Sequence, residues 1–221
     1  MAALLAIEGL GVELGGRRLL ADVSFELEAG AALALVGGSG SGKTTLLRAC
    51  LGLLPAGARA RGRVWWHHRP GPGRQRDLLQ NRPAQWRALR GRGIGWVPQE
   101  PSAALDPRRT ALQHWRECGG RGGGLEAVGL DAARARQYPF QWSGGMQQRL
   151  LVAMALARGP QLLLADEPTS ALDPIAQARL LELLAGLRRD RGFGMIFVTH
   201  DLAVAARAAE QVAVLHAGEV V

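Results

Sequence analysis

The sequence contains little cysteine, almost no lysine and no long apolar run. Its two cysteines, Cys50 and Cys118, are too few for a disulfide framework. No stretch of about 18 apolar residues could span a bilayer as a helix, and the first ten residues lack the basic start of a secretory signal peptide. We therefore expect a cytoplasmic protein. Its 221 residues predict one large domain, or a domain with a subdomain.

The formal net charge is +8. Such an excess of positive charge would suit nucleic acid or an anionic membrane surface as a neighbour. An arginine-rich sequence reaches the same excess without any such partner, so the charge alone leaves both interpretations open. Lys43 is the single lysine among the 27 basic residues, and it belongs to the most specific motif of the chain.

The glycine-rich motif around Lys43 is typical of phosphate binding. It matches the pattern G-x-x-x-x-G-K-[ST], the P-loop, and consists of Gly37, Gly38, Ser39, Gly40, Ser41, Gly42, Lys43, Thr44 and Thr45. The apolar residues 31–36 before the motif predict a buried strand, and residues 44–54 after it predict a helix. The motif therefore lies on a strand–loop–helix turn, as phosphate binding requires.

Each part of the motif has a chemical role toward a bound polyphosphate. Glycines let the backbone turn its N–H groups toward the phosphates, and the N-terminus of the next helix adds partial positive charge. Lys43 would reach the β- and γ-phosphates as a mobile point charge. The Thr44 hydroxyl would hold Mg²⁺, which accepts few protein ligands and keeps several waters.

The rest of the chain alternates between expected strands and helices. Residues 4–13 and 19–28 predict two antiparallel strands with one wet face. Buried strands are expected at residues 94–98, 161–166, 194–199 and 211–215. Helices are expected at residues 110–118, at 125–136 with an interruption near Gly129, at 143–158 after the N-cap Ser143, from 174 after the N-cap Asp173, and at 202–209. This order predicts an α/β fold with a mostly parallel central sheet and an antiparallel β subdomain.

Two pairs of potential metal ligands are weak candidates for a metal site. His67 and His68 are adjacent within the arginine-rich residues 59–92, and adjacent residues of a strand point to opposite faces. A short strand followed by a basic surface loop is the better interpretation there. His114 and Cys118 share one face of an expected helix, but two ligands do not close a metal site.

Polar side chains follow several of the expected strands, namely Gln99, Asp166, Glu167 and His200. Because ligands of parallel sheets bind beyond the carboxyl ends of the strands, we expect these side chains to meet the P-loop at one edge. Asp166 would hold Mg²⁺, and Glu167 would orient or deprotonate an attacking water. His200 would contact the γ-phosphate and position Glu167, while Gln99 would complete the metal shell and sense the γ-phosphate. Lys43, Glu167 and His200 are thus the candidate catalytic residues for phosphoryl transfer.

These motifs resemble those of ABC-type ATPase subunits over essentially the full length of the chain. Residues 143–148 (SGGMQQ) are similar to the family's signature motif, and residues 165–173 to Walker B running into the D-loop. Residues 199–201 match the H-loop and residues 97–101 the Q-loop. The resemblance implies ATP and Mg²⁺ at the site and a P-loop NTPase domain over residues 1–221. It also implies a small helical subdomain over about residues 100–158.

The resemblance further implies a dimer in which two subunits meet head to tail. Each ATP would lie between the P-loop of one subunit and residues Ser143, Gly144, Gly145 and Gln148 of the other. Closure of the dimer would drive membrane permease subunits between inward- and outward-facing states, with a solute-binding protein as an indirect partner and no nucleic acid. The subunit would be peripheral on the cytoplasmic face of the inner membrane, as a homodimer or beside a second ABC ATPase subunit.

Within this family the chain resembles the ATPase subunits of nickel, dipeptide and oligopeptide importers. Residues 99–107 (QEPSAALDP) resemble the extended Q-loop of that group, and residues 138–140 before the signature also fit it. Residues 52–57 favour the nickel members. The expected function is ATP hydrolysis that drives the import of nickel, a nickel complex or small peptides.

Three features depart from the family pattern. Leu14 stands where the family places an aromatic residue that stacks on adenine, which predicts weaker or less base-selective ATP binding. The glycine-rich residues 119–124 replace what is normally helix, so an abbreviated helical subdomain is expected. The sequence ends at Val221, whereas subunits of this group usually continue, so the usual C-terminal extension is expected to be missing.

Two alternative functions remain beside the importer. An ABC ATPase that acts on nucleic acid would suit the positive charge, but such chains usually carry a long coiled coil or zinc modules. Residues 46–142 contain neither sustained heptads nor paired C-x-x-C motifs. A weakly hydrolysing regulatory partner subunit is the other alternative, and the presence of both Glu167 and His200 argues against it.

Overall fold

The computed structural model describes residues 3–67, 75–122, 124–170 and 172–221. Its strands are β1 (Ala3–Leu14), β2 (Arg17–Glu28), β3 (Ala32–Val36), β4 (Arg59–His67), β5 (Gln75–Asp77), β6 (Ile94–Val97), β7 (Leu162–Ala165), β8 (Gly194–Thr199), β9 (Gln211–His216) and β10 (Glu219–Val220). Its α-helices are α1 (Lys43–Leu51), α2 (Pro83–Leu89), α3 (Pro101–Ala104), α4 (Ala111–Glu117), α5 (Gly144–Leu156), α6 (Pro174–Arg191) and α7 (Leu202–Ala208). Short 3₁₀ helices are η1 (Leu78–Gln80), η2 (Glu126–Val128), η3 (Ala132–Arg134) and η4 (Pro139–Gln141).

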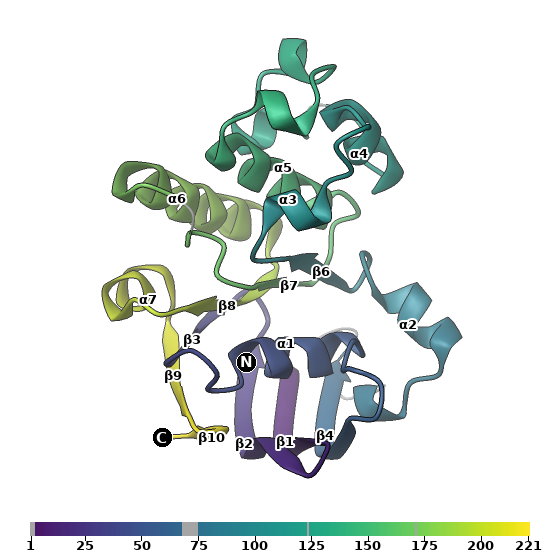
Figure 1. Ribbon diagram of the computed structural model, residues 1–221, viewed down its shortest axis with the longest axis vertical. Helices are drawn as coiled ribbons and strands as arrows, with labels where there is room; N and C mark the ends of the chain where they lie inside the picture. The colour runs from purple at the N-terminus through teal and green to yellow at the C-terminus, as the bar shows by residue number, and fades with distance from the viewer. Residues whose placement is uncertain (1–2, 68–74, 123, 171) are drawn as a thin grey trace.

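The strands form two sheets (Figure 1). The central sheet has the order β10-β9-β3-β8-β7-β6, and the smaller sheet has the order β2-β1-β4-β5. All neighbouring pairs of the central sheet are parallel except β9 and β10, whereas the smaller sheet is antiparallel throughout. This arrangement confirms the predicted α/β fold. It also places the carboxyl ends of β3, β6, β7, β8 and β9 at one edge.

The central sheet is covered on both faces (Figure 1). Leu33 and Leu35 of β3 belong to the core that includes α1 and the antiparallel sheet, while Ala32, Ala34 and Val36 belong to the core formed with α5, α6 and α7. Strands that are buried on both faces have continuous apolar runs, which is why these strands could be predicted from the sequence. Only the loops at the ends of such strands remain free to bind a ligand.

Side-chain caps fix the start of two helices near this edge, as predicted. Ser143 Oγ accepts a hydrogen bond from the Met146 N–H at 3.4 Å before α5. Asp173 Oδ1 accepts hydrogen bonds from the N–H groups of Ile175 and Ala176 at 3.0 and 2.9 Å before α6. Such caps satisfy N–H groups that have no partner within the helix.

Two helix predictions were wrong. Helix α1 ends at Leu51 instead of residue 54, because Gly52 adopts a left-handed conformation (φ 61°) and closes the helix. Residues 125–136 do not form one interrupted α-helix. They form η2 and η3, which are separated by a second left-handed residue, Gly129 (φ 70°).

The arginine-rich residues 59–92 contain more regular structure than predicted. They include the nine residues of β4 together with β5, η1 and α2. Helix α2 begins with Pro83 and buries Trp86 and Leu89, three residues apart on one face. Residues 68–74, which include His68, Pro70 and Pro72 and fall in the region of the expected basic loop, lie outside the described residues, as does Ala171 of the D-loop motif.

The segment between β6 and β7 contains α3, α4, η2, η3, η4 and α5, which gather at the top of Figure 1. Two of the glycines after α4 lie against the Trp115 ring, since a Cβ added to Gly120 or Gly124 would come within 2.1–2.2 Å of it. No helix in the described ranges has both the length and the apolarity needed to cross a membrane.

Gly52→Ala should destabilise the protein more than Gly57→Ala. Both glycines have positive φ angles (61° and 83°), so each alanine costs about 1–2 kcal/mol of backbone strain. A Cβ on Gly52 would lie 2.2 Å from the Trp86 ring, whereas nothing lies within 4 Å of one on Gly57. We expect the Gly52 variant to lose about 1–3 kcal/mol more in its free energy of unfolding in urea. Equal losses would contradict this account of the helix end.

Candidate active site

The phosphate loop runs from the end of β3 to the start of α1. Gly37 leaves no room for a side chain, because an added Cβ would lie 2.2 Å from the carbonyl oxygen of Leu215. Gly42 caps α1 with φ 108°, which other residues rarely adopt. Residues 38–40 between them are exposed. The loop therefore presents accessible backbone in front of a helix N-terminus, an arrangement that favours anion binding.

Lys43 folds back over this loop. Its Nζ donates hydrogen bonds to the carbonyl oxygens of Gly37 and Gly38, both at 2.8 Å, and to Ser41 Oγ at 3.5 Å. Its side chain is buried, so the ammonium group is held beside the accessible backbone. Thr45, the last residue of the motif, is half-buried in the first turn of α1.

Asp166 follows β7 and meets Thr44. Asp166 Oδ1 accepts a hydrogen bond from Thr44 Oγ1 at 3.2 Å. Burial raises the pKa of the Asp166 carboxyl above its usual value, and the hydrogen bond from Thr44 acts in the opposite direction. A hydroxyl and a carboxylate side by side are oxygen donors of the kind that Mg²⁺ accepts. These two residues therefore fit the predicted metal ion.

Glu167 lies at the polar edge, by which we mean the edge of the central sheet where Gln99, Asp166, Glu167 and His200 follow their strands. Its Oε2 is 3.5 Å from Gln99 Nε2 and 3.5 Å from His200 Nδ1. Its φ of 43° is unusual for a residue other than glycine, and such conformations cluster at functional sites. Both contacts are at the long limit for a hydrogen bond. The structure thus brings Gln99, Glu167 and His200 together.

Two residues near the site were missed by sequence reasoning. Arg48 lies four residues after Thr44 on the same face of α1, and its charge acts to lower the pKa of Asp166 against the larger effect of burial. The helical spacing could have identified it. Ser170 donates from its N–H and its Oγ to the carbonyl oxygen of Glu167, at 3.2 and 3.1 Å. No sequence pattern indicates that Ser170 supports the backbone of Glu167.

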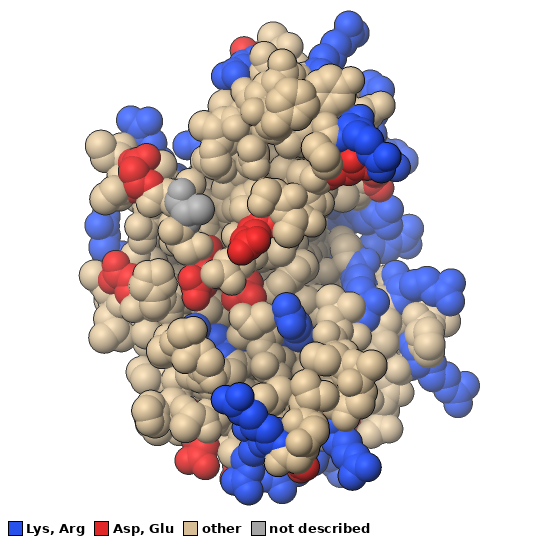
Figure 2. Space-filling model, viewed as in Figure 1, with Lys and Arg blue, Asp and Glu red and all other residues tan. Residues whose placement is uncertain are grey.

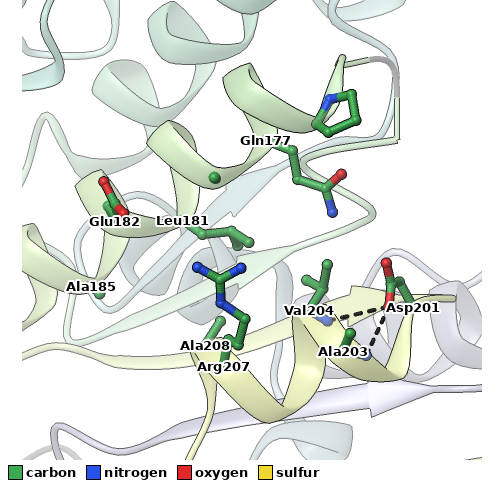
Figure 3. Close-up of a pocket in the computed structure, with 11 residues that line it drawn as sticks. Gln177, Leu181, Glu182, Ala185, Asp201, Ala203, Val204, Arg207 and Ala208 are labelled. Carbon is green, nitrogen blue, oxygen red and sulfur yellow. Dashed lines mark hydrogen bonds between the residues drawn. The ribbon is translucent and has the colours of Figure 1, made fainter.

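The loop that carries His200 is tied to the start of α7. Thr199 Oγ1 accepts a hydrogen bond from the Asp201 N–H at 3.1 Å. Asp201 Oδ1 in turn accepts from the N–H groups of Ala203 and Val204 at 2.8 and 3.3 Å, as the dashed lines of Figure 3 show. A cavity of about 270 Å³ lies between α6 and α7 in this region. No residue of the phosphate loop lines it, so it is separate from the phosphate site.

The signature residues lie away from the phosphate loop of their own chain. Ser143 and Gly145 line a cleft of about 420 Å³ together with Leu172 and Asp173, and no residue of the phosphate loop lines this cleft. Gly144 is exposed at the start of α5. Their predicted contact with ATP in trans stays a prediction.

Gln148, also predicted to contact ATP in trans, is enclosed in the protein. It is 3% exposed, and its Nε2 has no hydrogen-bond partner in the part of the chain that the structure describes. A contact with a nucleotide would require the side chain to turn outward.

The histidines that the structure describes outside the polar edge do not gather metal ligands. His114 is buried, and its Nε2 lies 3.1 Å from the carbonyl oxygen of Asp106. Over the described ranges, no group of three or more His, Cys, Asp or Glu side chains could hold a metal ion.

Basic residues lie at many separate places on the face seen in Figure 2. Figure 2 shows carboxylates near the middle of the visible face, while arginines occupy mainly its lower and right-hand margins. On this face the positive charge does not form one continuous patch of the kind that nucleic-acid binding would favour.

Asp166→Asn should stabilise the isolated protein at neutral pH. Burial raises the pKa of the Asp166 carboxyl above 3.8. The folded state therefore binds the proton of this carboxyl more tightly than the unfolded state does. Stability is therefore lost as pH rises through the raised pKa. Asparagine avoids that loss and keeps an oxygen that can accept from Thr44. We expect a higher urea midpoint than wild type at pH 7 and a smaller difference at lower pH. The control, Glu182→Gln, changes an exposed carboxylate, and a lower midpoint for Asp166→Asn at pH 7 would refute the argument.

Comparisons with known proteins agree with the fold and the motifs. Residues 20–170 match the family model described as ABC transporter. The chain is 40% identical over 234 residues to the nickel import ATP-binding protein NikD of Pseudomonas putida, in an alignment that covers 99% of this chain and 86% of that protein. It is 36% identical to the dipeptide transport ATP-binding protein DppD of Lactococcus lactis, covering 94% of this chain and 62% of that longer protein.

A solved structure shows the same architecture. The dimeric structure of MJ0796, a bacterial ABC transporter cassette, superposes with a TM-score of 0.81 at 29% identity, covering 98% of this chain and 96% of that one. The family match, the relatives and the shared architecture lead to the same conclusion as the motifs. The chain belongs to the ABC transporter family and is an ATPase of its ATP-binding cassette type.

Proposed function

We propose that this chain is the ATP-hydrolysing subunit of a membrane importer. The observation that carries the proposal is the single edge at which Thr44 contacts Asp166 while Gln99 and His200 both reach Glu167. The phosphate loop lies at the same edge, after β3. The edge thus combines an anion site with a candidate base, and phosphoryl transfer requires chiefly this positioning and charge stabilisation.

The phosphates of ATP bind to residues 37–45 in this proposal. Backbone N–H groups of the loop and the first turn of α1 surround them, and Lys43 exchanges its loop carbonyl partners for phosphate oxygens. Thr44, Asp166 and Gln99 hold Mg²⁺, which supplies charge neutralisation when it is bound. Burial of Asp166 also strengthens its electrostatic interaction with a nearby cation.

Hydrolysis depends on Glu167 and His200. Glu167 accepts a proton from the attacking water, and its carboxylate stands where Gln99 and His200 can both orient it. His200 is exposed, so it can contact the γ-phosphate as well. Ser170 fixes the backbone of Glu167 through the two contacts to its carbonyl oxygen.

A second subunit completes each site in this proposal. The cleft beside Ser143 and Gly145 contains no residue of the phosphate loop of its own chain, so those residues are available to a nucleotide held by another copy. The N-terminus of α5 would then face the γ-phosphate. The dimeric state of the similar cassette MJ0796 supports this arrangement. The partner is either a second copy or another ABC ATPase subunit.

The transported substrate proposed here is nickel, a nickel complex or a small peptide. The support is the similarity to a nickel import protein and to a dipeptide transport protein. The chain would bind permease subunits on the cytoplasmic face of the inner membrane, with a solute-binding protein acting indirectly. Leu14, which is half-buried at the end of β1, provides no ring for the adenine base.

Glu167→Gln should abolish ATP turnover and leave ATP binding intact. The amide keeps the size of the side chain but cannot accept the proton, and a positioned base contributes about 10²–10⁴-fold to a rate. Steady-state phosphate release and equilibrium ATP binding measure the two effects separately. Glu182→Gln on the exposed face of α6 serves as the matched control. Undiminished hydrolysis by Glu167→Gln would remove Glu167 from the role of base.

Affinity purification from detergent-solubilised membranes tests the importer proposal. We expect a multi-span permease to co-purify, because an importer subunit must bind its permease to couple hydrolysis to transport. A second ABC ATPase subunit in the same complex would identify a heterodimer. Recovery of only DNA-associated proteins would contradict the importer and favour the nucleic-acid alternative.

A further inference from the structure

Tyr138 and Phe140 form an exposed aromatic pair just before the signature helix α5. In the described part of the chain they are the only exposed residues among the phenylalanines, tyrosines and tryptophans, at 39% and 70%. Their rings are stacked, with centroids 5.6 Å apart and an angle of 8° between the planes. Since a ring in a stack covers only one face of its neighbour, Phe140 keeps a free face toward solvent.

The pair is rigidly attached to α5. Pro139, which lies between Tyr138 and Phe140 in the sequence, is buried. Its carbonyl oxygen accepts a hydrogen bond from Gln147 Nε2 at 2.9 Å. The same Nε2 donates to the carbonyl oxygen of Trp142 at 3.2 Å. Gln147 lies in the first turns of α5, so its side chain ties the aromatic segment to the start of the helix.

The buried indole of Trp142 adds a second attachment. Its Nε1 donates to Gln137 Oε1 at 3.0 Å, and the ring is 5% exposed. Residues on both sides of the aromatic pair are therefore fixed. An exposed aromatic pair on a backbone held in this way is partly preorganised for a flat ligand, because the segment that carries it need not become ordered on binding.

The distance from the pair to the start of α5 suits a nucleotide. Phe140 precedes Ser143 by three residues, which span at most about 10 Å of chain. The proposed function places the γ-phosphate of a second subunit's ATP at the N-terminus of α5. A nucleotide anchored there extends its ribose and base away from the helix end over a similar length. The chain length therefore allows Phe140 to reach that base.

On the phosphate-loop side of the described chain, the exposed rings are the imidazoles of His200 and His216, and no phenylalanine, tyrosine or tryptophan ring is exposed. Leu19 and Leu20 of β2 approach the loop, since a Cβ on Gly42 would lie 2.8 Å from the carbonyl oxygen of Leu19 and 2.6 Å from Leu20 Cδ2. Along the paired strands β1 and β2 the only aromatic residue is Phe25, which is half-buried. A phenylalanine, tyrosine or tryptophan platform for the base would therefore come from the other subunit.

We propose that Phe140, supported by Tyr138, stacks on the base of the ATP held by the phosphate loop of the other subunit. Phe140 is then a residue that determines base affinity in trans. This inference rests on the proposed head-to-tail site. It assigns base recognition to the signature side of that site.

The experiment compares Phe140→Leu, which keeps apolar bulk without a ring, with Phe140→Trp, which keeps a ring. Base stacking contributes about 1–3 kcal/mol, so we expect the ATP concentration that half-saturates hydrolysis by the purified chain to rise between about fivefold and a hundredfold for Phe140→Leu. Phe140→Trp should stay near wild type. Inorganic tripolyphosphate, which has no base, should compete with ATP binding equally well in all three proteins.

A second readout does not depend on hydrolysis. In the Glu167→Gln background, the ATP concentration needed for dimer formation, measured by light scattering, should rise for Phe140→Leu and not for Phe140→Trp. Unchanged ATP dependence of Phe140→Leu in both assays would overturn the proposal. If Phe140→Leu instead lost only its binding to the permease, the aromatic pair would be a protein contact. Absence of hydrolysis and of ATP-driven dimers in the parent proteins would contradict the proposed function itself.

Discussion

Burial of the central sheet on both faces is the constraint from which the site follows. The antiparallel sheet and α1 cover one face, and α5, α6 and α7 cover the other, so polar side chains on these strands are confined to the strand ends. Parallel pairing places those ends at one edge. Thr44, Gln99, the neighbouring Asp166 and Glu167, and His200 come from four separate segments of the chain, and they meet because that edge is shared.

Two residues at the same edge have features that lower the stability of the protein and that a stable fold alone would not require. Asp166 is a buried carboxyl whose pKa is raised by burial, and Glu167 has a left-handed backbone conformation. Each feature costs stability, and each suits a site that binds a cation and activates water. Contacts from Thr44 and Ser170 hold these two acidic residues in place. The energetic cost therefore falls on the residues to which the proposed chemistry assigns a role.

Much of the fold and most of the polar edge could be predicted from the sequence. The buried strands are continuous apolar runs, and Ser143 and Asp173 are recognisable caps. The errors have physical causes. Gly52 ends α1 early because a left-handed residue closes it. Arginines conceal the length of β4, which was expected to be short and whose buried residues Val64 and Trp66 alternate with exposed or half-buried ones. The support that Ser170 gives to Glu167 depends on turn geometry, which no residue pattern specifies.

A mixing experiment with two inactive variants tests the central claim, that each site is completed by a second subunit. Lys43→Ala disables the phosphate loop, and Gly144→Glu places bulk and negative charge at the start of α5, where nothing lies within 4 Å of an added Cβ. A mixed dimer retains one site with an intact phosphate loop and an intact signature from different chains. The account predicts that ATP hydrolysis reappears when the two proteins are mixed. No recovery on mixing, or full activity of Gly144→Glu alone, would contradict it.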